Sequence, residues 1–306
     1  MRANDSADCL IVGAGPAGLI AATYLARFRR RVLVMDDGRS RAAAIPCTHN
    51  CPGFPDGIAG TELLARLRAQ AERYGVSVQS GRVTEIRRIE SGFAAIAGDS
   101  EMRCRKIILA TGIVDRQPKL PNIRQLIWRG QLRLCPICDA YEAAEREIAV
   151  MGPSAHAIPK LAFLRGYTDR LLLLPLDECP LSPEQRDWLA HAGIQVCPSA
   201  VADLKIEGDS ITVILVNGEE RKVEVLYPAM GADPRADLLA SLGGKLNAEG
   251  CIETDAHQRT TVPGIYAAGD VVNELNQIAV AAGHAAIAAT HIHNTLREED
   301  RQIPPA

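Results

Sequence analysis

Residues 7–28 read ADCLIVGAGPAGLIAATYLARF and combine two patterns of different period. The apolar run Ala7–Val12 is typical of a buried strand, whereas Leu19–Phe28 has the apolar spacing of a helix. Three glycines lie between these runs, and a further apolar run at Arg31–Met35 predicts a second strand. A strand, a glycine turn, a helix and a strand form a βαβ unit, which feeds a parallel sheet.

The glycine turn has the spacing of a phosphate-binding loop. Its glycines allow a tight turn and close backbone approach to a pyrophosphate at the start of a helix. Asp36 ends the next strand, where a carboxylate accepts hydrogen bonds from ribose hydroxyls. The turn and the acidic pair therefore predict a dinucleotide site formed by Gly13, Gly15, Pro16, Ala17, Gly18, Asp36 and Asp37.

A second βα pattern follows a proline-containing linker at Gln117–Ile123. It has a strand at Ile148–Met151, a turn at Gly152–Ala157, a helix at Ile158–Arg165 and a strand at Arg170–Leu174. Three more β-like runs predict a small antiparallel sheet with a hairpin turn at Asn217-Gly218: Val201–Glu207, Ser210–Val216 and Arg221–Val225.

The chain then returns to the first domain after a second linker-like segment, Gly231–Pro234. We expect an α/β protein with two Rossmann-like dinucleotide-binding domains, the second inserted into the first. The predicted boundaries are 1–116 and 233–306 for the first domain and 117–232 for the inserted domain. A closing helix is predicted at Gln277–Asn294.

Composition and charge narrow the class of protein. The net charge of −3 argues against nucleic acid or an acidic membrane as a partner, because both need a basic face. No segment reaches the ~20 apolar residues of a membrane span. The nine cysteines are an odd number and follow no secretory signal, which favours reduced thiols in a cytoplasmic protein.

Cys135-Pro-Ile-Cys138-Asp139 is a candidate redox pair. Two cysteines just before a helix lie at its amide-rich N-terminus, where a thiolate is stabilised, and their short spacing allows reversible closure to a disulfide. Asp139 is placed to donate or accept the proton of the emerging thiolate. A zinc knuckle lacks a second pair of ligands, so no metal is expected, and two unconnected core cysteines are the remaining alternative.

The whole chain resembles the low-molecular-weight thioredoxin reductase family in domain order and motifs. The resemblance rests on the glycine turn, Cys-x-x-Cys-Asp and three later segments: Ala110-Thr111-Gly112, Gly269-Asp270 and Asn276-Gln277-Ile278-Ala279. It implies one FAD per chain, with Cys138 facing the flavin and Cys135 exchanging with the partner's sulfur. It also implies a homodimer and adds these candidate cofactor contacts: His49, Asn50, Val83, Ala110, Thr111, Gly112, Gly269, Asp270, Gln277, Ile278 and Ala279. His49 and Asn50 are candidates for polar contacts around either the flavin ring or the dithiol, and an ordinary loop histidine is the alternative for His49.

The inserted domain departs from the family at its nucleotide motifs. Ser154 replaces the middle glycine of the turn, and Pro159-Lys160 stand where the helix acids belong. Pro175 occupies the usual acid position, and Asp177-Glu178 replace the basic cluster that grips the 2′-phosphate of NADPH. We therefore expect an enzyme that does not use NADPH.

The electron donor and the partner stay open at this point. The donor is a ferredoxin or flavodoxin, a second flavin or nucleotide in the inserted domain, or a dithiol. The partner is a thioredoxin-like protein or a small-molecule disulfide or dithiol. The alternatives are an NAD(P)H-dependent thioredoxin reductase, a dithiol oxidase that uses oxygen, and a flavin-binding sensor without turnover. Cys47 and Cys51 are candidates for an auxiliary redox pair.

Overall fold

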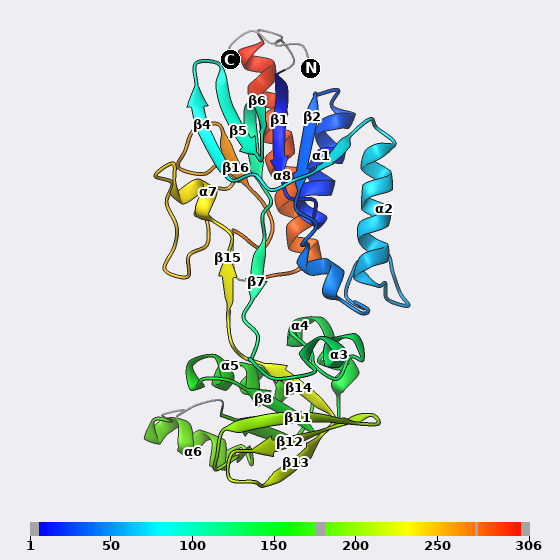
Figure 1. Cartoon of the computed structure of the whole chain (residues 1–306), viewed down its shortest axis with the longest axis vertical. Helices are drawn as coiled ribbons and strands as arrows, with labels where there is room; N and C mark the ends of the chain where they lie inside the picture. Colours follow the sequence, from blue (N-terminus) through cyan, green and yellow to red (C-terminus); the bar gives the residue numbers. More distant parts are fainter. Residues whose placement is uncertain (1–5, 176–180, 273–274, 301–306) are drawn as a thin grey trace. The chain divides into compact units, whose positions relative to one another are not determined.

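The computed structural model describes residues 6–175, 181–272 and 275–300. Contacts divide the chain into two units, shown in Figure 1. The first unit comprises the chain up to Ala43, Gly60–Val114 and the chain from Asp233 onward. The second unit comprises Ala44–Ala59 and Asp115–Ala232, so a loop that the sequence placed with the first domain has its contacts in the second.

The first unit is built on a seven-stranded sheet in the order β3-β2-β1-β6-β5-β4, with β16 also paired to β6. The parallel strands are β1 (Ala7–Val12), β2 (Val32–Asp36), β3 (Ser77–Ser80), β6 (Ser100–Leu109) and β16 (Ile265–Ala267). An antiparallel extension is made by β4 (Glu85–Ile89) and β5 (Gly92–Ala97). The continuous apolar run of β1 is buried because both faces of this sheet are covered.

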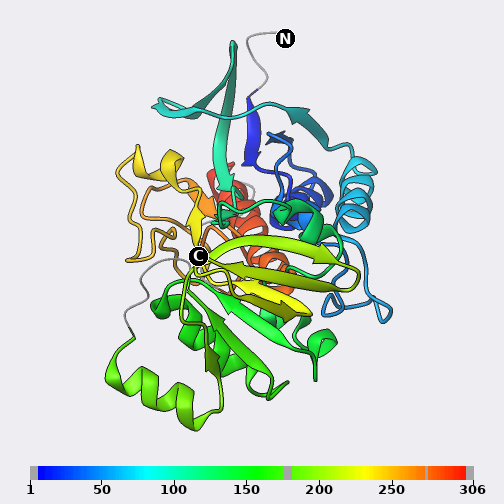
Figure 2. The same cartoon turned by 60° about the horizontal axis from the view of Figure 1, so that its bottom comes forward.

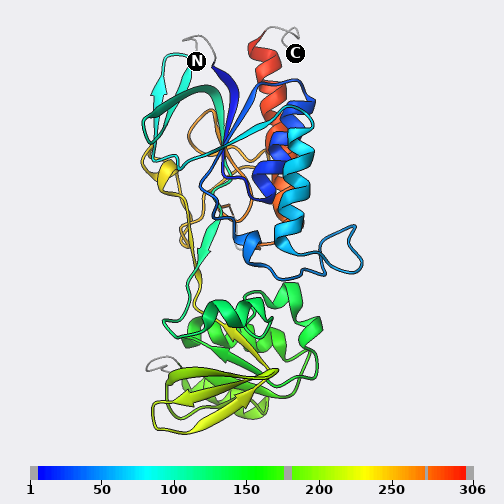
Figure 3. The same ribbon diagram turned by 45° about the vertical axis from the view of Figure 1, so that its right-hand side comes forward.

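Three helices pack against one face of this sheet, side by side in Figure 3: α1 (Pro16–Arg27), α2 (Gly60–Glu72) and α8 (Ile278–Glu299). Their shared core includes Leu19, Leu25, Ile108, Ala288 and Ile292. A second core on the other face includes Leu10, Phe93, Ile265 and Leu239, the last from α7 (Asp237–Ala240). The short helix η1 (Arg41–Ala44) follows β2. Small residues along α1 and α8 let these two helices pack closely, as the Ala-rich sequence predicts.

The second unit repeats the parallel pattern in a four-stranded sheet, in the order β10-β9-β8-β14. Its strands are β8 (Ile148–Met151), β9 (Leu171–Leu174), β10 (Gln195–Val196) and β14 (Val225–Pro228). Its helices are α3 (Ile123–Trp128), α4 (Pro136–Asp139), η2 (Tyr141–Ala143), α5 (Ser154–Leu164) and α6 (Pro183–His191).

A three-stranded antiparallel sheet completes the second unit and comes forward in Figure 2. It contains β11 (Val201–Glu207), β12 (Ser210–Leu215) and β13 (Glu220–Val223). The predicted hairpin is confirmed, because β12 and β13 are antiparallel and Gly218 has a φ of 84°. The short strands β7 (Ile113–Asp115) and β15 (Ala232–Pro234) pair where the chain enters and leaves the second unit, so the predicted linker at 231–234 is partly a strand.

The two helices that follow the glycine turns begin earlier than predicted. α1 begins at Pro16 rather than Leu19, and α5 begins at Ser154 rather than Ile158. The first turn of a helix needs no intrahelical N–H donors, so turn residues and proline are accepted there. The apolar periodicity therefore marks where each helix packs, not where it starts. The sequence did not predict α3, α6, β10 or β14.

Candidate active site

The glycine turn of the first unit is shaped for close approach of a ligand. Gly13 has a φ of 106°, and a Cβ there would lie 2.3 Å from the carbonyl oxygen of Ala110. A Cβ at Gly18 would lie 1.8 Å from the carbonyl oxygen of Gly13, so neither position accepts a side chain. Gly15 is the N-cap of α1 and Pro16 its first residue, which leaves the amide end of a twelve-residue helix at the turn. This backbone cradle fits the pyrophosphate of FAD.

The two acidic residues after β2 have different surroundings. Asp36 accepts hydrogen bonds from the backbone N–H groups of Ala14 (2.9 Å) and Gly38 (3.1 Å), so it lies beside the glycine turn. Asp37 instead accepts from the Arg39 side chain, at 3.0 Å from Nε. Of the predicted acidic pair, only Asp36 is joined to the turn by a hydrogen bond.

The later motifs of the first unit meet the same turn. A Cβ at Gly269 would lie 3.0 Å from Cβ of Ala17 on α1 and 3.8 Å from Cβ of Ala281 on α8, so Gly269 lies where these two helices begin. Gln277 is the N-cap of α8, and Ile278 and Ala279 are its first two residues. The tertiary fold thus brings the starts of α1 and α8 to one place.

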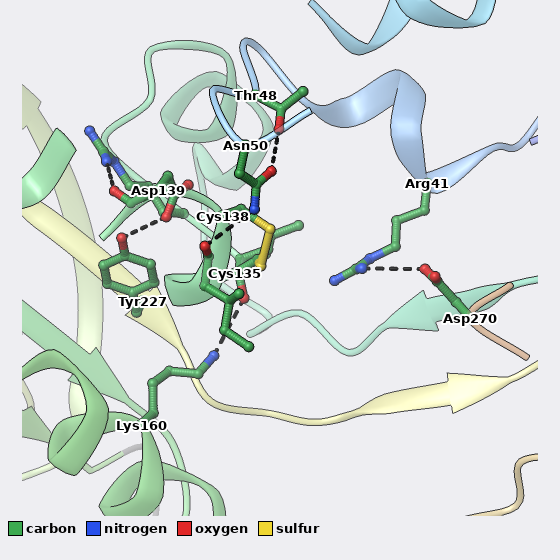
Figure 4. Close-up of a disulfide and its surroundings, with 12 residues drawn as sticks. Arg41, Thr48, Asn50, Cys135, Cys138, Asp139, Lys160, Tyr227 and Asp270 are labelled. Atoms are coloured by element: carbon green, nitrogen blue, oxygen red, sulfur yellow. Dashed lines mark hydrogen bonds and ion pairs between the residues drawn. A yellow bond between two sulfur atoms is a disulfide. The ribbon is translucent and has the colours of Figure 1, made fainter. Parts of the chain in front are cut away.

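Thr111 and Asp270, two further candidate cofactor contacts of the first unit, each interact with an arginine residue. The Thr111 hydroxyl donates to the carbonyl oxygen of Arg235 at 2.7 Å, and Gly112 follows with a φ of 68°. Asp270 forms an ion pair with Arg41 at 3.4 Å, drawn in Figure 4. Sequence reasoning missed Arg41, because nothing in the sequence links the η1 segment to a residue 229 positions later. Val83 is a buried core residue with 5% exposure.

Cys135 and Cys138 form a disulfide in the second unit, with their Cα atoms 5.3 Å apart. The structure differs from the prediction that both cysteines precede a helix. Cys135 is the N-cap of α4 and Cys138 is its third residue, because Pro136 starts the helix. The helix is a single turn, so the stabilisation of a thiolate by its dipole is smaller than expected for a long helix.

Asp139 follows Cys138 and is half-buried. Its carboxylate oxygen Oδ1 accepts a hydrogen bond from the hydroxyl of Tyr227 at 2.7 Å (Figure 4). Burial raises the pKa of Asp139 to about 6, although the Tyr227 hydrogen bond and the charge of Arg133 act to lower it. The carboxyl group can therefore hold or release a proton near neutral pH, as an acid–base partner of a thiol requires.

Tyr227 was missed by sequence reasoning, although the sequence contained a weak signal. It lies in β14, a strand with four buried residues, and is itself 0% exposed. A tyrosine in such a strand needs a partner for its hydroxyl, but the sequence does not say which one.

Two cations hold the backbone around the dithiol. Lys160 on α5 donates to the carbonyl oxygens of Pro228 (2.7 Å) and Leu134 (3.5 Å), the residue before Cys135. Arg133 donates to the carbonyl oxygens of Gly130 and Asp139. Lys160 therefore has a structural contact in the place where the family resemblance implies a helix acid.

The loop of residues 44–59 contacts the dithiol turn. The side-chain amide of Asn50 donates to the carbonyl oxygen of Ile137 at 3.3 Å and accepts from the Thr48 hydroxyl at 2.9 Å. His49 is exposed and lies at Gly57 together with Cys47: a Cβ at Gly57 would lie 2.9 Å from the His49 ring and 2.6 Å from Cys47 Sγ. Of these predicted candidates, Asn50 is thus joined to the dithiol turn.

The candidate auxiliary pair, Cys47 and Cys51, consists of reduced thiols. Cys47 is exposed, whereas Cys51 is buried, and burial raises its pKa. Its thiolate is therefore less available than that of an ordinary exposed cysteine.

The turn after β8 occupies the same place in its sheet as the glycine turn does after β1. Gly152 has a φ of 154°, and a Cβ there would lie 2.5 Å from the carbonyl oxygen of Ala229. In the strand register, Met151 pairs with Leu174, as Val12 pairs with Met35 in the first unit. Pro175 therefore holds the position of Asp36, and Ser154 that of Gly15. Asp177 and Glu178, predicted to repel a 2′-phosphate, lie outside the described residues.

Membrane-spanning helices and metal-binding clusters are absent from the described residues. No helix among them is long and apolar enough to cross a membrane. Among the same residues, no group of three or more His, Cys, Asp or Glu side chains is arranged to hold a metal ion.

Comparison with known proteins places this geometry in a family. Residues 7–285 match the pyridine nucleotide-disulphide oxidoreductase family. A thioredoxin reductase of Mycolicibacterium smegmatis is 30% identical over 306 residues, which cover 96% of this chain and 97% of the relative.

Solved structures agree over nearly the whole chain. The crystal structure of HlmI has a TM-score of 0.91 at 30% identity and covers 99% of this chain and 96% of its own. A thioredoxin reductase from Streptococcus pyogenes MGAS5005 has a TM-score of 0.87 at 25% identity, covering 97% and 100%. The chain therefore belongs to the pyridine nucleotide-disulphide oxidoreductase family, in which it is a thioredoxin reductase-like, flavin-dependent disulfide oxidoreductase.

Proposed function

We propose that the enzyme passes electrons between FAD in the first unit and the Cys135–Cys138 pair, and that NADPH does not supply them. The glycine turn, Asp36 and the start of α8 would hold FAD, which supplies a two-electron carrier when bound. The altered turn after β8 carries the second half of the proposal. The electron donor is a ferredoxin- or flavodoxin-type protein, a second flavin, or a dithiol.

The turn after β8 lacks the groups that a pyrophosphate needs. Pro153 has no N–H, whereas the corresponding residue of the first unit, Ala14, donates its N–H to Asp36. Ser154 places a side chain where Gly15 lets the ligand approach the backbone. Pro175, in the position of Asp36, offers no carboxylate for a ribose. Together these changes remove the open backbone beside a pyrophosphate, the carboxylate for a ribose, and the N–H that would hold that carboxylate.

Anaerobic stopped-flow mixing with NADPH, NADH and dithiothreitol in turn tests this proposal. Micromolar NADPH or NADH should leave the flavin absorbance unchanged for seconds, whereas dithiothreitol should reduce the disulfide and then the flavin. Photoreduction should bleach the flavin in the same sample, which shows that it is reducible. A Cys135→Ser/Cys138→Ser variant is the control and should lose the response to dithiothreitol. Fast bleaching by NADPH would overturn the proposal.

An NADPH-dependent thioredoxin reductase is the second candidate, because relatives with that name align with nearly the whole chain. Reduction of a thioredoxin with NADPH as the only donor would establish it. A dithiol oxidase would instead take up oxygen when a dithiol is added, and release peroxide. Oxygen-electrode traces with and without a dithiol panel separate these outcomes.

We further propose a cytoplasmic homodimer whose partner is a thioredoxin-like protein or a small disulfide or dithiol. The buried thiols of Cys9, Cys104 and Cys197 support a reducing compartment. The homodimer rests on the resemblance to the thioredoxin reductase family. Light scattering during gel filtration tests it, and a monomer at micromolar concentration would contradict it.

A further inference from the structure

The hydrogen bond between Tyr227 and Asp139 joins the sheet of the second unit to the dithiol turn. Tyr227 is fixed in β14, which pairs in parallel with β8, and its ring lies in a core with Ala140, Ala143 and Leu161. Asp139 is the last residue of α4 and follows Cys138. A fully buried phenol thus meets the carboxyl group next to the redox pair, at 2.7 Å (Figure 4).

We propose that Tyr227 is a positioning residue for the dithiol reaction: it orients the Asp139 carboxyl and sets the pH range in which this group exchanges protons with the thiols. The proposal rests on the proposed function of Cys135, Cys138 and Asp139. A bond from a rigid strand restrains the carboxyl better than a bond from a loop would, because β14 is buried and paired.

The charged and polar groups that face Asp139 come from three elements, β14, α5 and η2, and from the segment before α4. Tyr227 of β14 and the cations of Arg133 and Lys160 favour the ionised carboxylate. Burial opposes them, and so does the negative charge of Glu142 in η2, whose Oε2 atom is buried without a hydrogen-bond partner among the described residues. Removal of the Tyr227 hydroxyl should therefore shift the titration of Asp139 to higher pH.

The step in which Asp139 acts is thiol–disulfide exchange with an alkyl disulfide. The Cys135 thiolate attacks one sulfur of the partner, a mixed disulfide forms, and the partner's S–S bond breaks. The departing alkyl thiolate takes the proton of the Asp139 carboxylic acid. The Cys138 thiolate then attacks Cys135 and releases the second thiolate, so the enzyme is oxidised by two electrons and the partner disulfide is reduced.

The test measures the rate constant for reaction of the reduced, FAD-loaded enzyme with hydroxyethyl disulfide as a function of pH. The limb of the profile that is absent from Asp139→Asn belongs to Asp139. In Tyr227→Phe this limb should move to higher pH by about one unit, because a hydrogen bond to a charged group is lost. Tyr266→Phe is the matched control: its buried hydroxyl contacts His291 at 2.9 Å in the first unit, and the limb should not move.

A second disulfide separates proton transfer from a general loss of structure. The aromatic thiolate released from dithionitrobenzoate is stable without a proton, so its reaction should be insensitive to both Asp139→Asn and Tyr227→Phe. Equal loss of rate with both disulfides and an unmoved limb would overturn the role of Tyr227. A limb that persists in Asp139→Asn would instead contradict the acid–base role of Asp139, whereas a flavin that dithiothreitol does not reduce would contradict the proposed function, so these failures are distinct.

Two further variants keep the test decisive if Tyr227→Phe does not fold. Site-specific 3-fluorotyrosine at position 227 keeps the ring and the hydroxyl but makes a stronger donor, so the Asp139 limb should move to lower pH. Glu142→Gln removes a negative charge near Asp139, so it should also move the Asp139 limb to lower pH. In Asp139→Asn, adding 3-fluorotyrosine at position 227 should cause no further change in rate. Additive changes in rate, or a limb unmoved by fluorotyrosine, would refute the proposal.

Discussion

The two βαβ units of this chain have the same backbone arrangement at their glycine turns but different side chains around them. In both, a strand ends at a glycine with positive φ, Gly13 or Gly152, whose missing side chain makes room for a carbonyl oxygen. In both, that carbonyl belongs to the residue just after a neighbouring parallel strand, Ala110 after β6 or Ala229 after β14. The turn is therefore maintained by packing and backbone hydrogen bonds in each unit, whether or not it binds a nucleotide.

The difference lies in a few side chains around these turns. The first unit has Gly15 and Asp36, whereas the second has Ser154 and Pro175 at the corresponding positions. The second unit instead has a carboxyl group next to the disulfide, that of Asp139, which accepts a hydrogen bond from Tyr227. The comparison teaches that the glycine pattern predicts a fold, and that ligand binding must be read from the groups lining the turn.

The largest expected effect is at the glycine of the first turn. Gly13→Ala should remove most of the bound FAD and lower the free energy of unfolding by at least ~2 kcal/mol. The new Cβ would clash with the carbonyl oxygen of Ala110, and Gly13 has a positive φ, which other residues rarely adopt. Gly152→Ala introduces the same clash in the second unit and should leave the flavin content of the soluble protein unchanged. Flavin absorbance per chain after gel filtration measures both. Equal flavin loss in the two variants would break the comparison.

The two acids should respond oppositely to amide substitution. Asp139 has a pKa of about 6, above the ~4 of an unfolded chain, so its ionisation destabilises the fold as pH rises from about 4 through 6. Asp139→Asn should therefore stabilise the protein by about 2 kcal/mol at pH 8 and not at all at pH 4. Asp36→Asn should be destabilising at pH 8, because a carboxylate that accepts two backbone hydrogen bonds is lost.

Denaturant unfolding of the FAD-loaded protein at both pH values checks this pair. Since the two units can unfold separately, tryptophan fluorescence should accompany the flavin signal, because both tryptophans, Trp128 and Trp188, lie in the second unit. A pH-independent effect of Asp139→Asn would argue against a raised pKa.

A smaller effect is expected when the second turn is given the groups of the first. The triple variant Pro153→Ala, Ser154→Gly, Pro175→Asp should bind NADH about tenfold more tightly, or ~1.4 kcal/mol. Pro153→Ala restores a backbone N–H, Ser154→Gly lets the pyrophosphate approach the backbone, and Pro175→Asp supplies a carboxylate for the ribose. NADH fluorescence titration measures it, with Ser154→Gly alone as the control. An unchanged affinity would mean that groups outside this turn exclude the nucleotide.

The smallest effect concerns the loop that contacts the dithiol turn. Asn50→Ala removes one hydrogen bond to Ile137 and should slow exchange with a small disulfide two- to fivefold, about 0.5–1 kcal/mol. Asn217→Ala is the control, because Asn217 lies in the β12–β13 turn and bonds to Glu219. Equal rates in Asn50→Ala and the wild type would show that the contact is dispensable.

Sequence reasoning reached the fold class because its signals were short in range. Strand β1 and the strand at Ile148–Met151 were predicted with their observed bounds, and the disulfide joins the two cysteines that the motif singled out. The starts of α1 and α5 were predicted too late, because the apolar periodicity marks the turns that pack against the sheet and not the first turn of the helix. The placement of the 44–59 loop was missed because Asn50 and Ile137 are 87 residues apart.

Short local patterns thus indicated the family and the disulfide pair from the sequence alone: the glycine turn, Cys-x-x-Cys-Asp and the three later family segments. These patterns can be recognised in the sequence because each depends on only a few neighbouring residues in a defined backbone geometry. The partners of Asp139, Asp270 and Lys160 came from the folded chain. Tyr227 lies 88 positions from Asp139, and only the pairing of β14 with β8 places its hydroxyl beside that carboxyl. Contacts across such separations depend on strand order and packing, which no short pattern encodes.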